Sequence, residues 1–229
     1  MIYVMAHKQF NTELASFIPS KVLYLGQGVN PDENWLDSRS GDSISEKNPG
    51  YSELTGIYWV WKNGKEKAGD YVGIEHYRRY FLDTGYQMLH KDFLQMILKR
   101  FDVIVPTRFH LGPEETVENQ LSRIHSSLLT DAMKEVISSK YADYAPALER
   151  VLQEKSLHAF NMSVMKKPFF DRYCSWLFPI LFDIEALLTA KTGKTPDNRE
   201  IGYISERLMT VWLYYDNIAY YELPVLRLT

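Results

Sequence analysis

A short apolar strand that runs straight into ionisable and aromatic side chains is the feature that most constrains how this chain folds. The strand reads Tyr-Val-Gly-Ile at residues 71–74, and the cluster after it consists of Glu75, His76, Tyr77, Arg78 and Arg79. In open α/β sheets ligands bind beyond the carboxyl ends of strands, and arginine offers a permanently charged, forked donor to phosphate or carboxylate oxygens. The cluster is therefore either a ligand-binding edge or a surface group of ion pairs. Because successive strand residues face opposite ways, only one of the two arginines is expected to enter a given site.

Apolar runs alternate with helical patterns along the chain, which is typical of an α/β fold with a mostly parallel central sheet flanked by helices. Strands are predicted at residues 2–6, 22–25, 71–75, 102–106, 158–165 and 218–223. Helices are predicted at residues 11–17, 48–63, 87–100, 130–139, 143–154, 169–189 and 199–214, so the last third is helical. Residues 26–48 lack periodicity and predict a long surface loop. At 229 residues with 45% hydrophobic content, the chain is expected to form one domain, residues 1–229.

The helix at residues 48–63 has the clearest boundaries. Asn48 is expected to cap it, Pro49 suits its first turn, and Gly64 follows its end. Glu46 lies in the loop before this helix, where a carboxylate can meet a sugar hydroxyl or act as a base. The alternative is an ordinary surface glutamate, and the same choice applies to Glu53 on the helix.

Composition excludes several classes of protein. The formal net charge of −3 provides no overall basic field, which argues against general nucleic-acid binding. Cys174 is the single cysteine, so a disulfide within the chain is impossible. The first residues lack a basic region followed by a long apolar run, and no uncharged apolar stretch reaches about 18 residues. We therefore expect a cytoplasmic protein.

Motifs for common cofactors and metals are missing from the sequence. It contains neither a Walker-type glycine-rich loop nor a G-x-G-x-x-G after a strand, which argues against an NTPase or a dinucleotide enzyme. The nearest approach to a metal motif is Asp183-x-Glu185, which falls in an apolar helical pattern and is expected to be a solvated helix face. If a nucleotide diphosphate binds, positive charge must therefore come from His7, Lys8, His76 and the paired arginines.

Two further groups of polar residues offer candidates. His158, Asn161 and Ser163 alternate along residues 157–165, so a strand there would place them on one face. They are either core polar groups satisfied by neighbours or part of a substrate site. His7 and Lys8 likewise either border a ligand crevice at the end of the first strand or form a solvated pair. Arg199, Glu206 and Arg207 are expected to form the solvated side of the penultimate helix.

These segments together resemble a family of bacterial capsule and O-antigen galactofuranosyltransferases, formerly catalogued as a domain of unknown function. The most specific strings are Ser-Glu-Lys-Asn-Pro at residues 45–49 and His-Tyr-Arg-Arg-Tyr at residues 76–80. Further matching segments, in family order, are residues 3–8, 53–63, 102–106, 158–162 and 205–208. The resemblance therefore spans nearly the whole chain.

The resemblance implies transfer of galactofuranose from UDP-galactofuranose to a hydroxyl of a lipid-linked surface polysaccharide, on a nucleotide-diphospho-sugar transferase (GT-A-like) fold without cofactor or metal motif. The residues that it implies for donor binding are His7, Lys8, Tyr77, Arg78 and Arg79. It implies that Glu46, Asn48 and Asn161 border the donor sugar or the acceptor, and His158, on the polar face expected at residues 157–165, is assigned to the same group. If the transfer inverts the anomeric centre, a base must deprotonate the acceptor. The candidates for that base are Glu46, Glu75, His76 and Glu206.

Two alternatives stay open at this stage. The chain could transfer another sugar, because a fold does not fix the sugar that its pocket accepts. It could instead be a non-catalytic subunit that binds a glycan or a nucleotide. Contact with a lipid-linked acceptor would be peripheral, at the inner face of the cytoplasmic membrane.

Overall fold

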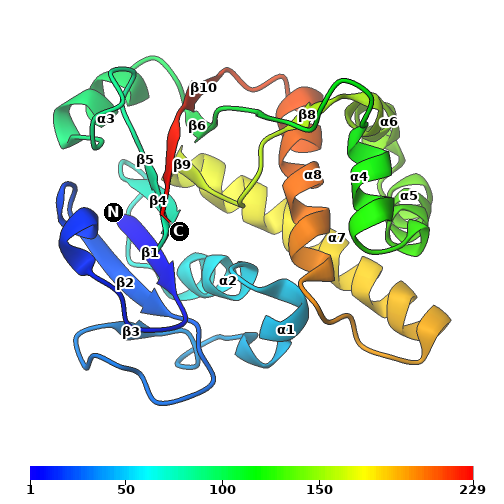
Figure 1. Ribbon diagram of the computed structural model, residues 1–229, viewed down its shortest axis with the longest axis horizontal. Coiled ribbons are helices and arrows are strands. Elements are labelled where there is room, and N and C mark those ends of the chain that lie inside the picture. The colour runs from blue at the N-terminus through cyan, green and yellow to red at the C-terminus, as the bar shows by residue number, and fades with distance from the viewer. Residues whose placement is uncertain (229) are drawn as a thin grey trace.

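A mixed β-sheet forms the centre of the computed structural model, which describes residues 1–228 (Figure 1). The main path of the sheet has the order β10-β6-β9-β4-β1-β2-β3, and β5 and β11 extend it from the end of β4. Its strands are β1 (Ile2–Ala6), β2 (Ser20–Tyr24), β3 (Leu36–Asp37), β4 (Tyr71–His76), β5 (Arg79–Phe81), β6 (Val103–Pro106), β9 (Ser163–Lys166), β10 (Tyr220–Leu223) and β11 (Val225–Arg227). A separate ribbon pairs β7 (Phe109–His110) with β8 (Ser156–Leu157).

Strand direction confirms the prediction of a mostly parallel sheet. Along the main path within residues 1–228, β9 alone is reversed, because it pairs antiparallel with β4 and with β6. The pairs β1 with β2, β1 with β4, β2 with β3 and β6 with β10 are all parallel. The carboxyl ends of β1 and β4 therefore lie side by side, and this junction positions the site described below.

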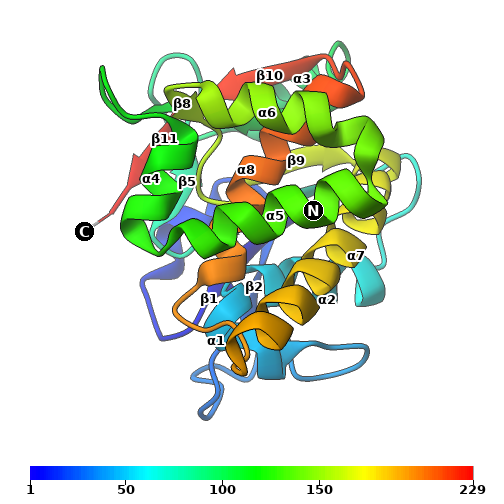
Figure 2. The ribbon, with the colours of Figure 1, turned by 90° about the vertical axis from the view of Figure 1, so that its right-hand side faces the viewer.

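Helices cover the sheet in two layers on one side. In Figures 1 and 2, α7 and α8 lie between the sheet and an outer group formed by α4, α5 and α6. The α-helices are α1 (Asn48–Tyr51), α2 (Leu54–Asn63), α3 (Lys91–Leu98), α4 (Val117–Ile124), α5 (Ser127–Lys140), α6 (Ala145–Gln153), α7 (Lys167–Thr192) and α8 (Glu200–Tyr215). Short 3-10 helices are η1 (Thr12–Ser16), η2 (Ser45–Lys47) and η3 (Ala142–Tyr144).

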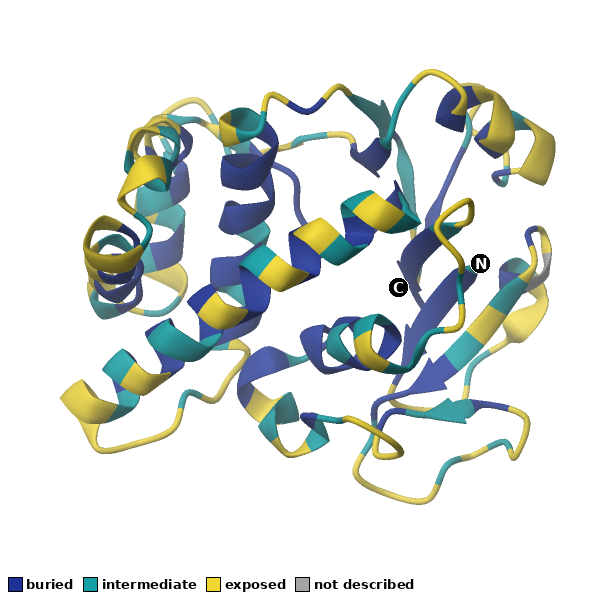
Figure 3. Ribbon diagram, turned by 180° about the vertical axis from the view of Figure 1, so that it is seen from behind, coloured by how far each residue is buried: buried dark blue, intermediate teal, exposed yellow. Residues whose placement is uncertain are grey.

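Side-chain alternation along the strands divides the interior into two cores. On β1, Tyr3 and Met5 pack with the α1, α2, α7 and α8 side, whereas Ile2 and Val4 pack with the η1 and α3 side. Figure 3 shows the strands and the inner faces of the helices as buried. Complete burial of an aliphatic side chain stabilises a fold by about 1.5–3 kcal/mol, so both faces of the sheet contribute.

The helix predicted at residues 48–63 is in fact two helices. Ser52, with φ of 52°, separates α1 from α2, and Asn48 is the first residue of α1 rather than a cap. The Asn48 Nδ2 donates instead to the Ser52 carbonyl and to Thr55 Oγ1, each at 3.1 Å. Gly50 allows the break to pack closely, because a Cβ there would lie 2.5 Å from the Pro196 carbonyl oxygen. Gly64 ends α2 as predicted.

The strand predicted at residues 158–165 is wrong over its first half. β8 ends at Leu157 and β9 begins at Ser163, and between them Phe160 and Asn161 have φ of 79° and 50°. Both values lie in the left-handed region, which a strand does not use. His158, Asn161 and Ser163 therefore do not share a strand face, because tertiary contacts outweigh the local pattern here.

The long helix α7 is buried where a solvated face was predicted. Glu185 is 8% exposed, and its carboxylate accepts hydrogen bonds from Lys47 Nζ at 2.8 and 2.9 Å and from the Tyr51 hydroxyl at 2.8 Å. These contacts fasten η2 and α1 to α7. By length and composition α7 could cross a membrane, and half of its most apolar window is buried inside the protein.

Candidate active site

Two adjoining hollows lie at the carboxyl edge of β1 and β4. The first hollow has an empty volume of about 530 Å³ and the second of about 650 Å³, each including the open solvent at its mouth. Both are lined by Glu53, His76, Arg79 and Arg199. The first is further lined by Met5, Ala6, His7, Leu25, Asn48, Ser52, Tyr77 and Arg78. The second is further lined by Phe109, Gln120, Ile124, Leu157, Ala159, Phe160, Tyr203 and Glu206.

The turn after β4 brings both adjacent arginines to the first hollow. β4 ends at His76 and β5 begins at Arg79, so Tyr77 and Arg78 form a turn to which strand alternation does not apply. The Tyr77 N–H donates to the Met5 carbonyl at 3.0 Å, which fixes the turn against the end of β1. The expectation that only one arginine could enter the site was therefore wrong.

Glu75 lies on the opposite face of β4 from His76. It belongs to the side of the sheet covered by η1 and α3, and its Oε1 accepts a hydrogen bond of 2.8 Å from the Phe81 N–H. Burial raises the pKa of Glu75 to about 7, although the Phe81 hydrogen bond lowers it. The Glu75 side chain thus connects β4 to β5 by a hydrogen bond, and it lines neither hollow.

His7 and Lys8 separate at the end of β1. His7 lines the first hollow, with its ring edge against Tyr77 at 5.0 Å between centroids. Burial and the nearby charges of Lys8 and Arg78 lower the pKa of His7. Lys8 lies in a neighbouring hollow with its Nζ 5.8 Å from the centre of the Tyr77 ring. Of the two, only His7 lines the first hollow, and Lys8 shares its own hollow with Arg78.

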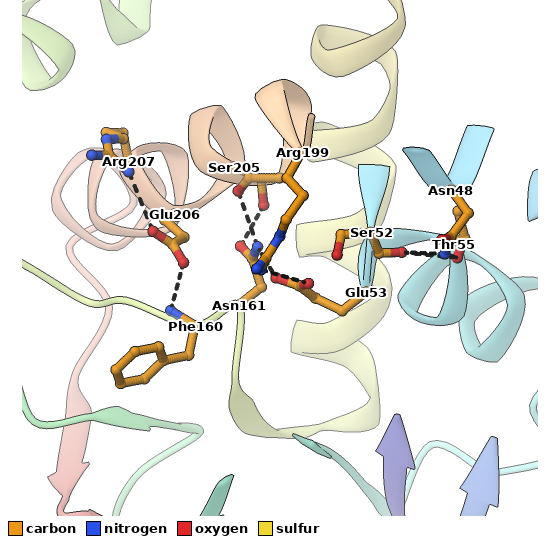
Figure 4. Close-up of polar contacts among 11 residues, drawn as sticks. Asn48, Ser52, Glu53, Thr55, Phe160, Asn161, Arg199, Ser205, Glu206 and Arg207 are labelled. Carbon is orange, nitrogen blue, oxygen red and sulfur yellow. Dashed lines mark hydrogen bonds and ion pairs between the residues drawn. The ribbon is translucent and has the colours of Figure 1, made fainter. Parts of the chain in front are cut away.

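A hydrogen-bonded network holds Glu53 at the boundary between the hollows (Figure 4). Glu53 Oε1 accepts from Asn161 Nδ2 at 2.8 Å, and Oε2 lies 3.4 Å from the Arg199 guanidinium. The same Asn161 amide also donates to the Gly202 carbonyl at 3.0 Å and accepts from Ser205 Oγ at 2.6 Å. Asn161, predicted to touch the sugar or acceptor, therefore lies behind Glu53 and orients it.

The electrostatics of the boundary favour an ionised glutamate beside a neutral histidine. Burial alone would raise the pKa of Glu53, but His76, Arg199 and the Asn161 amide lower it below its ordinary value. Burial lowers the pKa of His76 to about 4, helped by Arg79 and Arg199 and opposed by Glu53. The His76 Nε2 is buried and has no hydrogen-bond partner among residues 1–228. It is therefore an unsatisfied polar atom of the boundary, and it is shielded from the solvent of both hollows.

Glu206 lines the second hollow and is not part of a solvated helix face. Its Oε1 accepts from the Phe160 N–H at 2.9 Å, and its Oε2 lies 3.2 Å from Arg207. Arg207 is completely buried and donates to the Tyr203 carbonyl at 2.9 Å and to Gln120. Burial raises the pKa of Glu206, while Arg207 opposes the rise. The prediction of a solvated face was wrong because α4 and the segment before β9 cover this part of α8.

Besides Glu75, Lys8 and Asn161, two more predicted site residues lie outside both hollows. His158 is buried, and both of its ring nitrogens have partners. Thr210 Oγ1 and Glu222 Oε1 each lie 3.0 Å from one of these nitrogens. Glu46 is exposed in η2 and is absent from both linings. Neither position supports contact with a ligand in the cleft.

Sequence reasoning missed several residues of the cleft. Arg199 reaches it because the backbone at Asn198 and Arg199 is left-handed and the Arg199 N–H donates to the Pro49 carbonyl at 2.9 Å. No local sequence pattern predicts that Arg199 reaches the cleft or that it contacts α1. Among residues 1–228, no group of three or more His, Cys, Asp or Glu side chains is placed to hold a metal ion.

The chain belongs to the family described as a domain of unknown function, DUF4422, which matches residues 1–217. Among solved structures, the apo form of the WbbM bifunctional glycosyltransferase matches it with a TM-score of 0.82 and 26% sequence identity. The match covers 100% of this chain and 45% of that one, so the chain spans less than half of WbbM. No protein with a curated description matches the chain. The expected α/β fold and the link to a domain of unknown function are thus confirmed.

Proposed function

We propose that residues 1–229 form one glycosyltransferase domain that moves a sugar from a nucleotide diphosphate to a hydroxyl. The similarity to WbbM, which is described as a bifunctional glycosyltransferase, supports this class of reaction. The observation that carries the proposal is the convergence of Arg78, Arg79 and Arg199 on the first hollow. Clefts of this kind at the carboxyl ends of strands are where open α/β sheets bind nucleotides.

The arginines of the first hollow provide positive charge for a diphosphate. Their guanidinium groups can pair with phosphate oxygens in a forked geometry and stabilise charge that develops on the departing nucleotide. His7 adds a ring nitrogen close to the same space. We therefore propose a transfer that does not require Mg²⁺ or Mn²⁺.

Glu53 is our proposed catalytic base. It lines both hollows, its pKa lies below the ordinary value, and its Oε2 lies 3.4 Å from the Arg199 guanidinium. Glu206 lines the second hollow but not the first, and its two oxygens have shorter contacts of 2.9 and 3.2 Å. His76, a neutral ring that lines both hollows, lies at the same boundary.

With these groups, each bond and proton of the proposed transfer can be followed. The acceptor O–H gives its proton to Glu53 Oε2, and the oxygen forms a bond to the anomeric carbon from the face opposite the nucleotide. The bond from that carbon to the diphosphate breaks, and its electron pair leaves with UDP. The anomeric centre inverts in this single displacement.

We propose UDP-galactofuranose as the donor and a lipid-linked surface-polysaccharide intermediate as the acceptor. The family resemblance of residues 45–49 and 76–80 supports this choice. Such an acceptor would place the protein in the cytoplasm, in peripheral contact with the inner face of the membrane. Nucleic acid is not a proposed partner.

The test is UDP release by the purified protein from UDP-galactofuranose and from UDP-galactopyranose, with synthetic galactosides as acceptors and with or without EDTA. We expect release from the furanose donor that survives EDTA. Arg78→Ala should raise the KM for the donor about tenfold or more, since a hydrogen bond to a charged group contributes about 1.5–3 kcal/mol. Arg100→Ala, at an exposed position outside both hollows, is the matched control.

The outcomes separate the competing functions. Release only from other nucleotide sugars would keep the transferase class and replace the donor. UDP binding that Arg78→Ala weakens, with no turnover from any donor, would indicate a non-catalytic binding subunit. Turnover abolished by EDTA would contradict the proposed role of the arginines.

A further inference from the structure

The second hollow differs from the first in its charge. Among the described residues, three arginines and one glutamate line the first hollow, whereas two of each line the second. An excess of arginine suits a diphosphate, and a balanced set suits a neutral ligand with many hydroxyl groups. In the second hollow, the side-chain oxygens of Glu206 and Gln120 already accept from Phe160 and Arg207, and each oxygen has a second lone pair for a hydroxyl.

Aromatic rings form the outer wall of the second hollow. Phe109 and Phe160 approach with their ring centroids 6.4 Å apart and their planes inclined by 63°. Phe109 is 38% exposed, and Tyr203 contributes a third ring from α8. Sugar rings combine an apolar C–H surface with polar edges, so a site with aromatic walls and carboxylates matches their chemistry.

A strained segment builds this hollow. Phe160 and Asn161 both have left-handed backbone, which is uncommon for residues other than glycine and is found at functional sites. The Phe160 N–H is bonded to Glu206 and the Asn161 amide to Glu53 (Figure 4). These two hydrogen bonds connect the segment to Glu53 at the boundary and to Glu206 in the second hollow.

From these features we infer that the second hollow binds the terminal sugar of the acceptor glycan. The aromatic wall of Phe109 and Phe160 contacts the C–H surface of that sugar, and Glu206 accepts one of its hydroxyls. The reacting hydroxyl points to the boundary, where Glu53 Oε2 lies. This inference rests on the proposed function, because it assigns a subsite to the second substrate of that reaction.

The experiment compares Phe109→Ala with Phe17→Ala, a phenylalanine of similar exposure, 46%, that lies outside both hollows. Binding of octyl galactoside is followed by saturation-transfer NMR, and steady-state kinetics give the KM for each substrate. We expect Phe109→Ala to raise the KM for the acceptor about fivefold to tenfold, the size of one aromatic contact. The donor KM and slow hydrolysis of the donor without acceptor should not change. Phe109→Trp should restore acceptor binding, and Phe17→Ala should match the wild type.

Failure of this inference is distinct from failure of the proposed function. Wild-type turnover with an unchanged acceptor KM in both Phe109→Ala and Phe160→Ala would overturn the inference and leave the transferase intact. If the wild type releases no UDP from any donor, the transferase proposal fails, but the NMR measurement still decides the subsite. Equal octyl galactoside signals for the wild type and Phe109→Ala would then overturn it, and loss of signal in Phe109→Ala alone would support it.

Discussion

Asn161 donates a hydrogen bond of 2.8 Å from its side-chain amide to Oε1 of Glu53, although the two residues are 108 positions apart in the chain. This bond sets the orientation of the only acidic side chain that lines both hollows among the described residues. It also helps to hold the pKa of Glu53 below its ordinary value, against the effect of burial. The network around Asn161 thus contributes, after His76 and Arg199, to the low pKa of the proposed base.

The acid limb of the pH–rate profile should distinguish Glu53 from Glu206 as that base. Burial raises the pKa of Glu53, but His76, Arg199 and Asn161 outweigh it, so Glu53 ionises below the usual 4.5. Because the base must be ionised, we expect kcat/KM to stay high down to about pH 5 and to fall below pH 4.5. A limb well above pH 4.5 would instead point to Glu206, whose pKa burial raises. Circular dichroism at each pH separates titration from acid unfolding.

Asn161→Asp should move this limb to higher pH. The substitution keeps the size of the side chain, replaces the amide donor by a carboxylate beside Glu53, and suits the left-handed backbone. The nearby negative charge and the lost hydrogen bond should raise the pKa of Glu53 and reduce kcat at neutral pH. The donor KM should change much less than kcat. Asn217→Asp is the matched control, since Asn217 is exposed and also has a left-handed φ of 47°. An unshifted limb in Asn161→Asp would exclude Glu53 as the base.

The pattern of apolar residues along the sequence predicted the main helices and strands. It did not predict the positions at which two of them are interrupted. The apolar run at residues 2–6 became β1 with the predicted bounds, because a buried parallel strand needs little more than a short apolar segment. The helix at residues 48–63 and the strand at residues 158–165 failed for a common reason. At Ser52, Phe160 and Asn161 the chain adopts left-handed backbone to satisfy contacts with segments remote in sequence.

The candidate site was predictable only where it follows a strand end. His7 follows β1, His76 is the last residue of β4, and Arg78 and Arg79 come shortly after it, so their convergence on one edge follows from parallel pairing. Arg199 and the pairing of Asn161 with Glu53 depend on how α8 docks against α1, which no local pattern encodes. His158 was assigned to the site because strand alternation was assumed where the chain turns.

Arg207→Met should destabilise the fold strongly. Arg207 is fully buried between Glu206, the Tyr203 carbonyl and Gln120, and removal of one partner of a buried pair typically reduces stability by about 3–5 kcal/mol. Urea unfolding at pH 7 measures the change. Arg123→Met should leave stability nearly unchanged, because that side chain is 65% exposed in its pair with Glu115. The double variant Arg207→Met with Glu206→Gln should regain part of the loss, and no recovery would contradict an electrostatic origin.

Glu75→Gln should make the protein more stable above neutral pH. Burial raises the pKa of Glu75 from 4.5 to about 7, so the folded state binds a proton that the unfolded state releases between these values. The stability associated with the neutral form is therefore complete below pH 4.5 and is lost as the pH rises to about 7, by about 3 kcal/mol. The Gln side-chain oxygen can still accept the Phe81 N–H, so the variant should lack this loss. Urea unfolding should give similar stabilities for the two proteins at pH 5 and a higher value for Glu75→Gln at pH 8. A variant less stable than the wild type at pH 8 would show that the carboxylate is ionised and stabilised in the folded protein.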